Sequence, residues 1–231
     1  RVKPGEVWSV LGRNGVGKTT LLHTLAGLRD PLGGQIKLDG VALNSLATKT
    51  RGQKVSILFQ QSQAPISTDA YDFVMSARHP WISRWAGPTR DDQDIVVESL
   101  SQMGLDALMH RDVNSLSGGE RRRVELAATV AQNAQTILLD EPVNHLDLHY
   151  QINLLQGALT KWRAEGRAVV MVMHDLNLAI RFSDHLLCLC GDGSILQGET
   201  SAVATTENLS TLLRYPLRAL TLGDRSFFIP A

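Results

Sequence analysis

The chain has 231 residues, enough for one domain, or one domain with an inserted lobe, around a substantial buried core. Its 23 basic and 23 acidic side chains cancel, which argues against a nucleic-acid-binding domain with a strong basic excess. No segment approaches the roughly 18 consecutive apolar residues that span a bilayer. The start, residues 1–6, has turn chemistry rather than the features of a signal peptide. We therefore expect a soluble protein that reaches a membrane only through a partner.

Short apolar runs and glycine-rich turns alternate in the first part of the chain, and the period of the apolar residues changes from strand to helix spacing. The elements predicted here are, in order, a strand over 7–11, a glycine loop, a helix over 18–28, a strand over 35–38 ending in a hairpin-type turn at Asp39-Gly40, and a strand over 55–59. From residue 68 to 111 the chain becomes polar and helical, with interruptions at Pro80 and Pro88. We interpret about 68–118 as a helical subdomain inserted into the core.

Alternation of apolar strands and helices resumes after this insertion. The predicted elements are a helix over 119–132, a strand over 136–139, a helix over 148–164, a strand over 168–173, a helix over 176–182, a strand over 186–189, a helix over 207–214 and a hairpin around Gly223-Asp224. Strands that alternate with helices predict a mostly parallel sheet covered on both faces, hence an α/β fold. The whole chain is expected to form one domain around this sheet.

The two cysteines, Cys188 and Cys190, lie in an apolar run. Two positions on a strand separated by one residue face the same way, which is poor geometry for a disulfide between them. The paired spacing of zinc and redox motifs is absent. Buried, reduced thiols in a reducing compartment are the main interpretation, and a redox or metal role is the alternative.

A phosphate-binding loop is predicted between the first strand and the first helix. Residues 12–19 read Gly-Arg-Asn-Gly-Val-Gly-Lys-Thr and match G-x-x-x-x-G-K-[ST]. Glycines let backbone N–H groups surround a phosphate chain, and the helix N-terminus adds a favourable dipole. Lys18 is expected to reach the outer phosphates and Thr19 to ligate Mg²⁺. The residues predicted to contact ATP here are Gly12, Asn14, Gly15, Gly17, Lys18, Thr19 and Thr20.

Two acidic residues follow the apolar run 136–139. A buried strand that ends in a carboxylate places Asp140 at the carboxyl edge of the sheet, where α/β folds bind ligands, and there it can hold Mg²⁺ through water. Glu141 points elsewhere and is the candidate to polarise an attacking water. Together with the loop at 12–19, this order of motifs predicts a P-loop nucleotidase.

Residues 116–120, Leu-Ser-Gly-Gly-Glu, supply a third motif. A serine and two glycines at a helix start form an anion site, although Ser117 can equally be a simple helix N-cap. The motif resembles the signature of ATP-binding-cassette (ABC) proteins, with Glu120 where that family most often has Gln. The resemblance covers nearly the whole chain. It implies that Ser117, Gly118 and Gly119 grip the γ-phosphate of ATP held by a second copy of the chain.

The same resemblance assigns further roles, one position at a time. Gln60, after the strand 55–59, matches the glutamine that senses Mg²⁺ and water and links to the membrane partner, with neighbouring Gln61 as the alternative. Asp147, in the run 144–147, is implied to contact the other subunit. His174, directly after the strand 168–173, matches the histidine that binds the γ-phosphate. No role is assigned to His23, His79, His110, His145, His149 or His185.

One part of the family pattern is missing. ABC cassettes usually begin with antiparallel strands that carry an aromatic residue stacked on adenine, whereas this sequence begins at the turn before the P-loop strand. We expect those strands to precede the given sequence, the alternative being that adenine is held differently. No adenine-stacking residue is named.

Two segments narrow the family resemblance. Residues 76–87, with Trp81 and Trp85, and residues 174–179 look like the ATPases of bacterial importers of ferric siderophores, haem and cobalamin. This implies two copies of the chain on the cytoplasmic face of the inner membrane, beneath a polytopic permease dimer that receives cargo from a periplasmic binding protein. The two tryptophans either form an exposed partner surface or pack in the helical core. The cargo itself is not readable, because this subunit does not touch it.

Two rival functions come from other classes, besides an ABC subunit for another small substrate. A soluble ABC ATPase of translation or DNA repair usually carries two cassettes or a long coiled-coil insertion, and neither is present. A non-catalytic nucleotide-gated module is expected to lack Glu141 or His174, and both are present. The sequence therefore favours an ATP-hydrolysing transport subunit.

Overall fold

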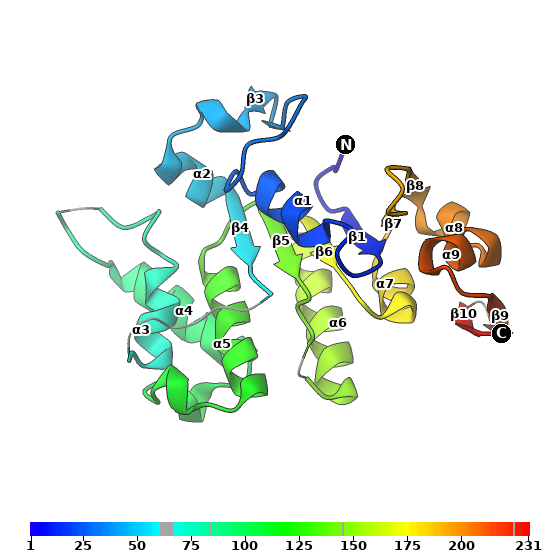
Figure 1. Ribbon diagram of the computed structural model, residues 1–231. Coiled ribbons are helices and arrows are strands. Elements are labelled where there is room, and N and C mark those ends of the chain that lie inside the picture. Colours follow the sequence, from blue (N-terminus) through cyan, green and yellow to red (C-terminus); the bar gives the residue numbers. More distant parts are fainter. Residues whose placement is uncertain (61–66, 84, 145, 224) are drawn as a thin grey trace.

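The structure is a computed structural model that describes residues 1–60, 67–83, 85–144, 146–223 and 225–231. Within these residues the main sheet has six strands in the order β4-β5-β6-β1-β7-β8 (Figure 1). Its strands are β1 (Val7–Gly12), β4 (Val55–Leu58), β5 (Thr136–Asp140), β6 (Ala168–Val172), β7 (His185–Leu189) and β8 (Ile195–Glu199). All pairings are parallel except β7 with β8, which is antiparallel. The predicted, mostly parallel α/β sheet is confirmed.

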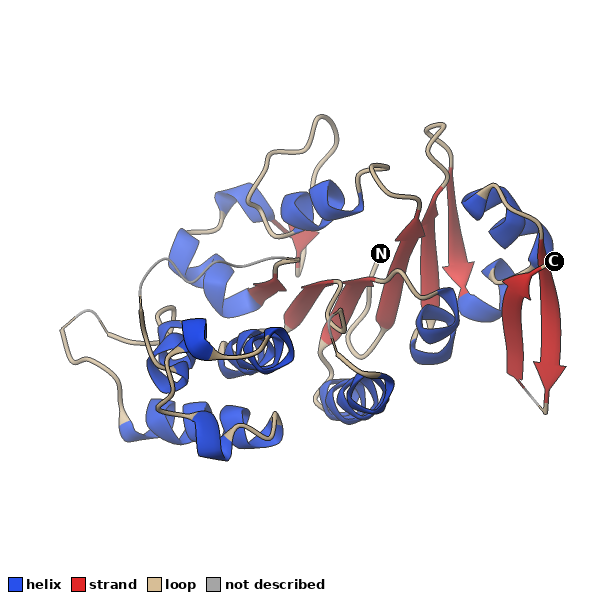
Figure 2. Ribbon diagram, turned by 60° about the horizontal axis from the view of Figure 1, so that its bottom comes forward, coloured by secondary structure: helices blue, strands red, loops and turns tan. Residues whose placement is uncertain are grey.

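Both faces of the sheet are buried, and alternate residues of one strand belong to different cores. Ile137 and Leu139 pack on the side of α6 (Leu148–Ala164) and α7 (Leu176–Phe182). Leu138, between them, packs on the side of α1 (Lys18–Leu25). Figure 2 shows helices above and below the red strands. Because successive strand residues point to opposite faces, a continuous apolar run marks a strand buried on both sides.

The helices of residues 68–131 form a separate cluster beside the sheet (Figure 1). They are α3 (Ala70–Ser76), α4 (Arg90–Gln102) and α5 (Gly118–Ala131), with 3₁₀ turns at Asp106–Leu108 and Val113–Ser115. On α5, Val124 and Ala127 face this cluster, whereas Leu126 and Val130 face the core of the sheet. Helix α5 is therefore shared by the two hydrophobic cores.

The tryptophans of this cluster are not part of its core. Trp85 is 94% exposed and Trp81 is 39% exposed. The indole N–H of Trp81 donates to the Gln132 carbonyl, 2.6 Å away, and the Arg78 guanidinium lies over its ring. Core packing, the alternative interpretation from the sequence, is therefore wrong for Trp85.

Several predicted boundaries differ from the observed ones. The helix predicted over 18–28 ends at Leu25, because Gly27 adopts a left-handed φ of 71° that a helix cannot continue through. The strand predicted over 35–38 is only β2 (Lys37–Leu38), which pairs with β3 (Val41–Ala42) through the predicted turn. Three elements were not predicted: α2 (Thr48–Lys54), the antiparallel strand β8, and α8 (Thr200–Val203). Each is short and buries at most one residue, so its apolar pattern is weak.

The last part of the chain adds a small layer beside α7. Helix α9 (Thr206–Leu213) is followed by the antiparallel pair β9 (Leu217–Leu222) and β10 (Arg225–Pro230), which forms the hairpin expected at Gly223. Cys188 is buried and Cys190 is half-buried, and both are free thiols. No helix in the described part of the chain has the length and apolar character to cross a membrane.

Candidate nucleotide site

The glycine loop between β1 and α1 has a backbone that other residues cannot readily adopt. Gly12 has a φ of 155°, and a Cβ on it would meet the Leu189 carbonyl oxygen at 2.8 Å, because Gly12 pairs with Leu189 of β7. Gly17 caps α1 with a left-handed φ of 103°. Non-glycine residues pay roughly 1–2 kcal/mol for that conformation. The glycines therefore allow the tight, left-handed backbone with which such a loop surrounds a phosphate chain.

Lys18, in the first turn of α1, is 7% exposed and bends back over the loop. Its ammonium donates to the carbonyls of Gly12, at 2.8 Å, and Arg13, at 3.2 Å. Burial lowers the pKa of Lys18, and the negative charges of Glu141 and Asp140 partly offset that effect. Lys18 thus brings a buried positive charge to the mouth of the loop.

Asp140, the last residue of β5, is completely buried, and neither carboxylate oxygen has a hydrogen-bond partner among the described atoms. Burial raises the pKa of Asp140, and the nearby Thr19 hydroxyl partly offsets the rise, although it does not form a hydrogen bond of ordinary geometry. A buried carboxylate without a partner is costly, so this oxygen pair is suited to a cation.

The donors around Asp140 fit Mg²⁺ rather than a metal held by protein ligands alone. Within the described residues, no three His, Cys, Asp or Glu side chains gather to form a metal cage. Mg²⁺ usually takes one or two protein oxygens and completes its octahedron with water and phosphate oxygens. Thr19 and Asp140 supply that set beside the phosphate loop.

Glu141 follows Asp140, and each of its two carboxylate oxygens has a hydrogen-bond partner. The Nε2 atom of His174 bonds to Oε1, and the side-chain amide of Asn144 donates to Oε2. Glu141 is 5% exposed and has a left-handed φ of 51°, while its N–H donates to the Val172 carbonyl at 3.1 Å. Strained backbone of this kind is concentrated at functional sites.

A cavity of about 310 Å³ brings these groups together from four parts of the sequence. Gln60 lies at its rim after β4, and His174 follows β6. The alternative to Gln60, Gln61, lies outside the described residues. The residues lining the cavity are Asn14, Gly15, Gly17, Lys18, Thr19, Thr20, Gln60, Glu141 and His174. Gly12 forms the start of the loop, and Asp140 lies buried next to Thr19.

The remaining predicted site residues lie elsewhere. Ser117 is exposed at the start of α5, where its hydroxyl accepts from the Glu120 N–H at 3.3 Å and the Glu120 carboxylate accepts from the Ser117 N–H at 2.8 Å. Ser117 is therefore a helix N-cap, as the plainer interpretation holds, and Gly118 and Gly119 follow it in the first turn. Asp147 caps α6 by accepting from the Tyr150 N–H at 3.0 Å. None of these four residues lines the cavity that contains Lys18.

Two residues at the site were missed from the sequence. Asn144 was seen only as part of the run 144–147, but its amide holds Glu141. Arg122 is one of three consecutive arginines that follow the run 116–120, and it is 4% exposed with its guanidinium bound to the strand ends beside Glu141. No local pattern distinguishes Arg122 from Arg121 or Arg123, so only its burial identifies it.

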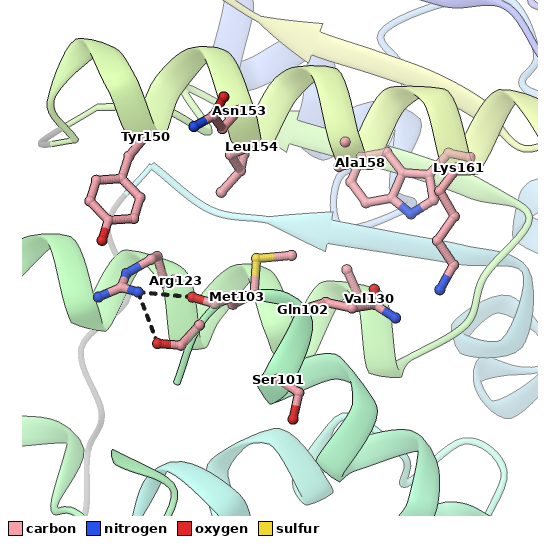
Figure 3. A pocket seen from close by; sticks show the side chains of 13 residues that line it. Ser101, Gln102, Met103, Arg123, Val130, Tyr150, Asn153, Leu154, Ala158 and Lys161 are labelled. Carbon is pink, nitrogen blue, oxygen red and sulfur yellow. Dashed lines mark hydrogen bonds between the residues drawn. The ribbon is translucent and has the colours of Figure 1, made fainter. Parts of the chain in front are cut away.

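A larger cavity, about 680 Å³, lies between α4, α5 and α6 (Figure 3). There Arg123 donates to the carbonyls of Met103 and Gly104, and its guanidinium lies 5.1 Å from the Tyr150 ring centre. Of the described residues that line it, none is Asp, Glu or His. Its size does not make it the nucleotide site, because it lacks the phosphate loop and the carboxylates.

Comparisons with known proteins agree with this geometry. A family model described as "ABC transporter" matches residues 1–144. The hemin import ATP-binding protein HmuV of Pseudomonas fluorescens is 38% identical over 230 residues, which cover 97% of this chain and 88% of the relative. The petrobactin import ATP-binding protein FpuD of Bacillus anthracis is 36% identical over 216 residues, 92% of this chain and 78% of the relative. A solved structure described as a metal-chelate type ABC transporter, facing inward, has a TM-score of 0.84 and 29% identity, and covers 99% of this chain and 87% of that chain.

The family match spans more than half of the chain, and the two relatives extend the similarity over nearly all of it. The phosphate loop, the orphaned carboxylate of Asp140 and the held carboxylate of Glu141 are the parts that such an enzyme needs. The chain therefore belongs to the ABC transporter family, in which it binds ATP with Mg²⁺ and acts as an ATPase.

Proposed function

We propose that the chain is the ATP-hydrolysing subunit of an importer and that two identical copies work beneath a polytopic permease dimer. It lies on the cytoplasmic face of a bacterial inner membrane and couples ATP hydrolysis to uptake of an iron-siderophore, haem or cobalamin type of cargo. A periplasmic binding protein delivers the cargo to the permease. The names of the relatives, which import hemin and petrobactin, support this class.

The cavity beside β1 carries the proposal, because it gathers groups for each part of ATP hydrolysis. Lys18 leaves the loop carbonyls and binds the outer phosphates. Thr19, Asp140 and Gln60 hold Mg²⁺, directly or through water, and the ion neutralises phosphate charge when it is bound. Those roles account for the unpartnered oxygens of Asp140.

The remaining pair of residues, Glu141 and His174, acts on the attacking water and on the γ-phosphate. Glu141 accepts a proton from the water or polarises it, since its carboxylate lies in the cavity and is held in one orientation. His174 holds Glu141 through Nε2 and is near enough to the cavity to bind the γ-phosphate in turn. Each carboxylate oxygen keeps a second lone pair, so the two hydrogen bonds do not prevent contact with water.

A second copy of the chain completes the site. Ser117, Gly118 and Gly119 do not line the cavity of their own chain, yet they form an exposed helix start suited to an anion. Facing copies would place this helix start on the γ-phosphate in the other copy's cavity, with Asp147 near the contact. The two composite sites would then hydrolyse ATP only in the dimer.

We also propose that residues of about 68–118 form a helical subdomain that contacts the permease. They pack around a hydrophobic core that one face of α5 completes, which supports a distinct structural unit. Trp85, almost fully exposed, and Trp81 beside it offer apolar surface of the kind that anchors a partner.

Two variants separate binding from chemistry. Lys18→Ala should weaken ATP binding by at least about tenfold, because it removes the buried cation nearest the phosphates. Glu141→Gln should leave ATP affinity within about twofold of wild type and abolish turnover, because Glu141 acts on water rather than on the bound phosphates. Equilibrium nucleotide binding and ATPase assays on the assembled transporter measure both effects.

A variant that binds ATP without hydrolysing it should stay in the ATP-bound dimer, and this gives a second measurement. Glu141→Gln protein with ATP and Mg²⁺ should elute as a dimer in size-exclusion chromatography, whereas Lys18→Ala protein should stay monomeric. A monomeric Glu141→Gln protein, or hydrolysis near the wild-type rate, would contradict the role of Glu141. Uptake of labelled hemin, ferric siderophore and cobalamin by cells with the intact operon then identifies the cargo.

A further inference from the structure

Arg122 is a buried arginine whose five N–H donors are all engaged. It lies in α5 and is 4% exposed. One donor binds the carboxylate of Glu125 at 2.8 Å, on the same helix. The other four reach backbone carbonyls outside α5: Phe59 at 2.7 Å, Asp140 at 2.6 Å, Glu141 at 2.8 Å and Pro142 at 3.4 Å. A guanidinium presents five donors in a rigid fork, so its position is set by all five acceptors together.

These carbonyls lie at the carboxyl ends of two neighbouring strands. β4 ends at Leu58, just before Phe59, and β5 ends at Asp140. Where strands end, carbonyls lose their ladder partners, and buried carbonyls need replacement donors. Arg122 supplies those donors and joins the two strand ends to α5.

Glu141 is the residue most dependent on this arrangement. Its φ of 51° is unfavourable for a residue with a side chain, so the surrounding contacts must hold it there. Its N–H is bonded to Val172 on one side, and its carbonyl is bonded to Arg122 on the other. The direction of the Glu141 carboxylate, towards His174, follows from that backbone conformation.

We infer that Arg122 is a positioning residue for ATP hydrolysis: it holds the backbone of residues 140–142 so that the Glu141 carboxylate faces the cavity. This inference rests on the proposed role of Glu141. Arg122 does not line the cavity, and the acceptors of its hydrogen bonds lie outside the phosphate loop. Its loss should therefore affect the chemical step and spare nucleotide binding.

A second buried arginine provides a matched control. Arg78 is 5% exposed, forms an ion pair with Asp92 at 2.8 Å and donates to the Ala131 carbonyl at 2.8 Å. These contacts lie within the helical cluster, and none of them involves residues 140–142 or the lining of the nucleotide cavity. Loss of Arg78 breaks a comparable buried network without touching the strand ends.

The experiment compares Arg122→Gln, Arg122→Lys and Arg78→Gln in the assembled transporter. We expect Arg122→Gln to lower kcat by at least about tenfold, because a small displacement of a catalytic group strongly slows the chemical step. The Kd for ATP should stay within about twofold of wild type. Arg122→Lys, which keeps a cation and up to three donors, should recover part of kcat. Arg78→Gln should lower Tm about as much as Arg122→Gln does. Its kcat, measured well below Tm, should stay within about twofold of wild type.

Several outcomes would overturn the inference. They are a kcat near wild type in Arg122→Gln, an ATP Kd that weakens in step with kcat, or the same loss of kcat in Arg78→Gln at equal loss of Tm. If Arg122→Gln fails to fold, a wild-type kcat in Arg122→Lys contradicts the inference, and a reduced kcat with unchanged ATP Kd supports it.

Glu141→Gln separates this inference from the function on which it rests. In the Glu141→Gln background, Arg122→Gln should not lower the slow residual single-turnover rate, measured over long incubations with enzyme in excess of ATP, because both changes act on the same carboxylate. A further loss in the double variant would overturn the inference. Wild-type hydrolysis by Glu141→Gln alone would instead refute the proposed role of Glu141, whatever Arg122 does.

Discussion

Asp140 is suited to binding a cation, and its buried charge lowers the stability of the folded protein when no cation is bound. It is fully buried and lacks hydrogen-bond partners, so its charge is poorly stabilised until a cation arrives. Burial, and then the neighbouring charge of Glu141, raise the pKa of Asp140. A carboxyl with a raised folded-state pKa destabilises the folded protein fully above that pKa, and this cost declines as the pH falls from the folded-state pKa to the lower, unfolded-state pKa. Such a trade of stability for function is common at active sites.

Asp140→Asn should therefore stabilise the protein without nucleotide or Mg²⁺. Removing the buried charge relieves a cost of about 1–3 kcal/mol, which corresponds to a rise in Tm of about 2–10 °C for a chain of this size. The rise should be larger at about pH 7 than at about pH 4, close to the ordinary pKa of an aspartate, because the cost of the buried charge is lost as the pH falls from the raised pKa towards that value. Thermal unfolding of both proteins in EDTA at the two pH values measures it. An unchanged or lower Tm at pH 7 would contradict the reasoning, as would a difference independent of pH.

At the scale of elements, helix α5 combines three tasks. It starts at an exposed turn capped by Ser117, carries Arg122 just over one turn later, and contributes to both hydrophobic cores. Its first turn is closed by a capping box in which the Glu120 carboxylate binds the Ser117 hydroxyl at 2.7 Å. Hydrogen bonds from the Ser117 hydroxyl and then from its N–H lower the pKa of Glu120. An ionised carboxylate therefore lies where the proposed function places a partner's γ-phosphate.

Glu120→Gln should strengthen ATP-driven dimerisation while leaving α5 intact. Glutamine preserves the capping box, and the lost negative charge no longer opposes phosphate at the helix start. In the Glu141→Gln background, the ATP concentration for half-maximal dimer formation should fall by about twofold or more, with Tm unchanged. Light scattering during an ATP titration measures it. Glu207→Gln, which removes an acidic residue from the first turn of α9, is the matched control and should have no effect.

At the scale of the whole molecule, the proposed site is divided between copies. The cavity with Lys18 and the helix start with Ser117 belong to different parts of the fold, and no described residue of the signature turn lines that cavity. Each chain would therefore contribute half of two sites. In a dimer of two different variants, one altered in the phosphate loop and the other at Ser117, one site would carry both changes and the other site would carry neither.

Mixing Lys18→Ala with Ser117→Arg protein tests this division. In a mixed dimer, one site combines both lesions and the other pairs an intact phosphate loop with an intact Ser117. Some ATPase activity should reappear on mixing two inactive proteins, even if coupling between the sites keeps it small. The decisive control is Ser117→Arg alone, verified as folded and assembled with the permease. Wild-type hydrolysis by that protein would reduce Ser117 to a helix cap.

Local sequence was sufficient for features made by neighbouring residues. The glycine loop at 12–19 and the strand-to-acid run at 136–141 were identifiable because phosphate and Mg²⁺ binding require particular residues at fixed, short spacings. Helices α6 and α7 begin and end where their apolar periodicity predicted. Weakly patterned elements such as α2 and β8 were not found, since their conformation depends on what they pack against.

Only the tertiary structure decided which distant groups meet. Arg122 reaches the Phe59 carbonyl, 63 residues away in sequence, and the carbonyls that flank Glu141. It is one of three successive arginines with the same chemistry, and the side on which a helix is buried selects the one that turns inward. The positions of His174 and Asn144 on the Glu141 carboxylate likewise arise from parallel strands and turns ending at one edge of the sheet. The sequence determined the reactive groups by their short-range spacing. The folded sheet and α5 determined how those groups are held, because that depends on contacts between segments far apart along the chain.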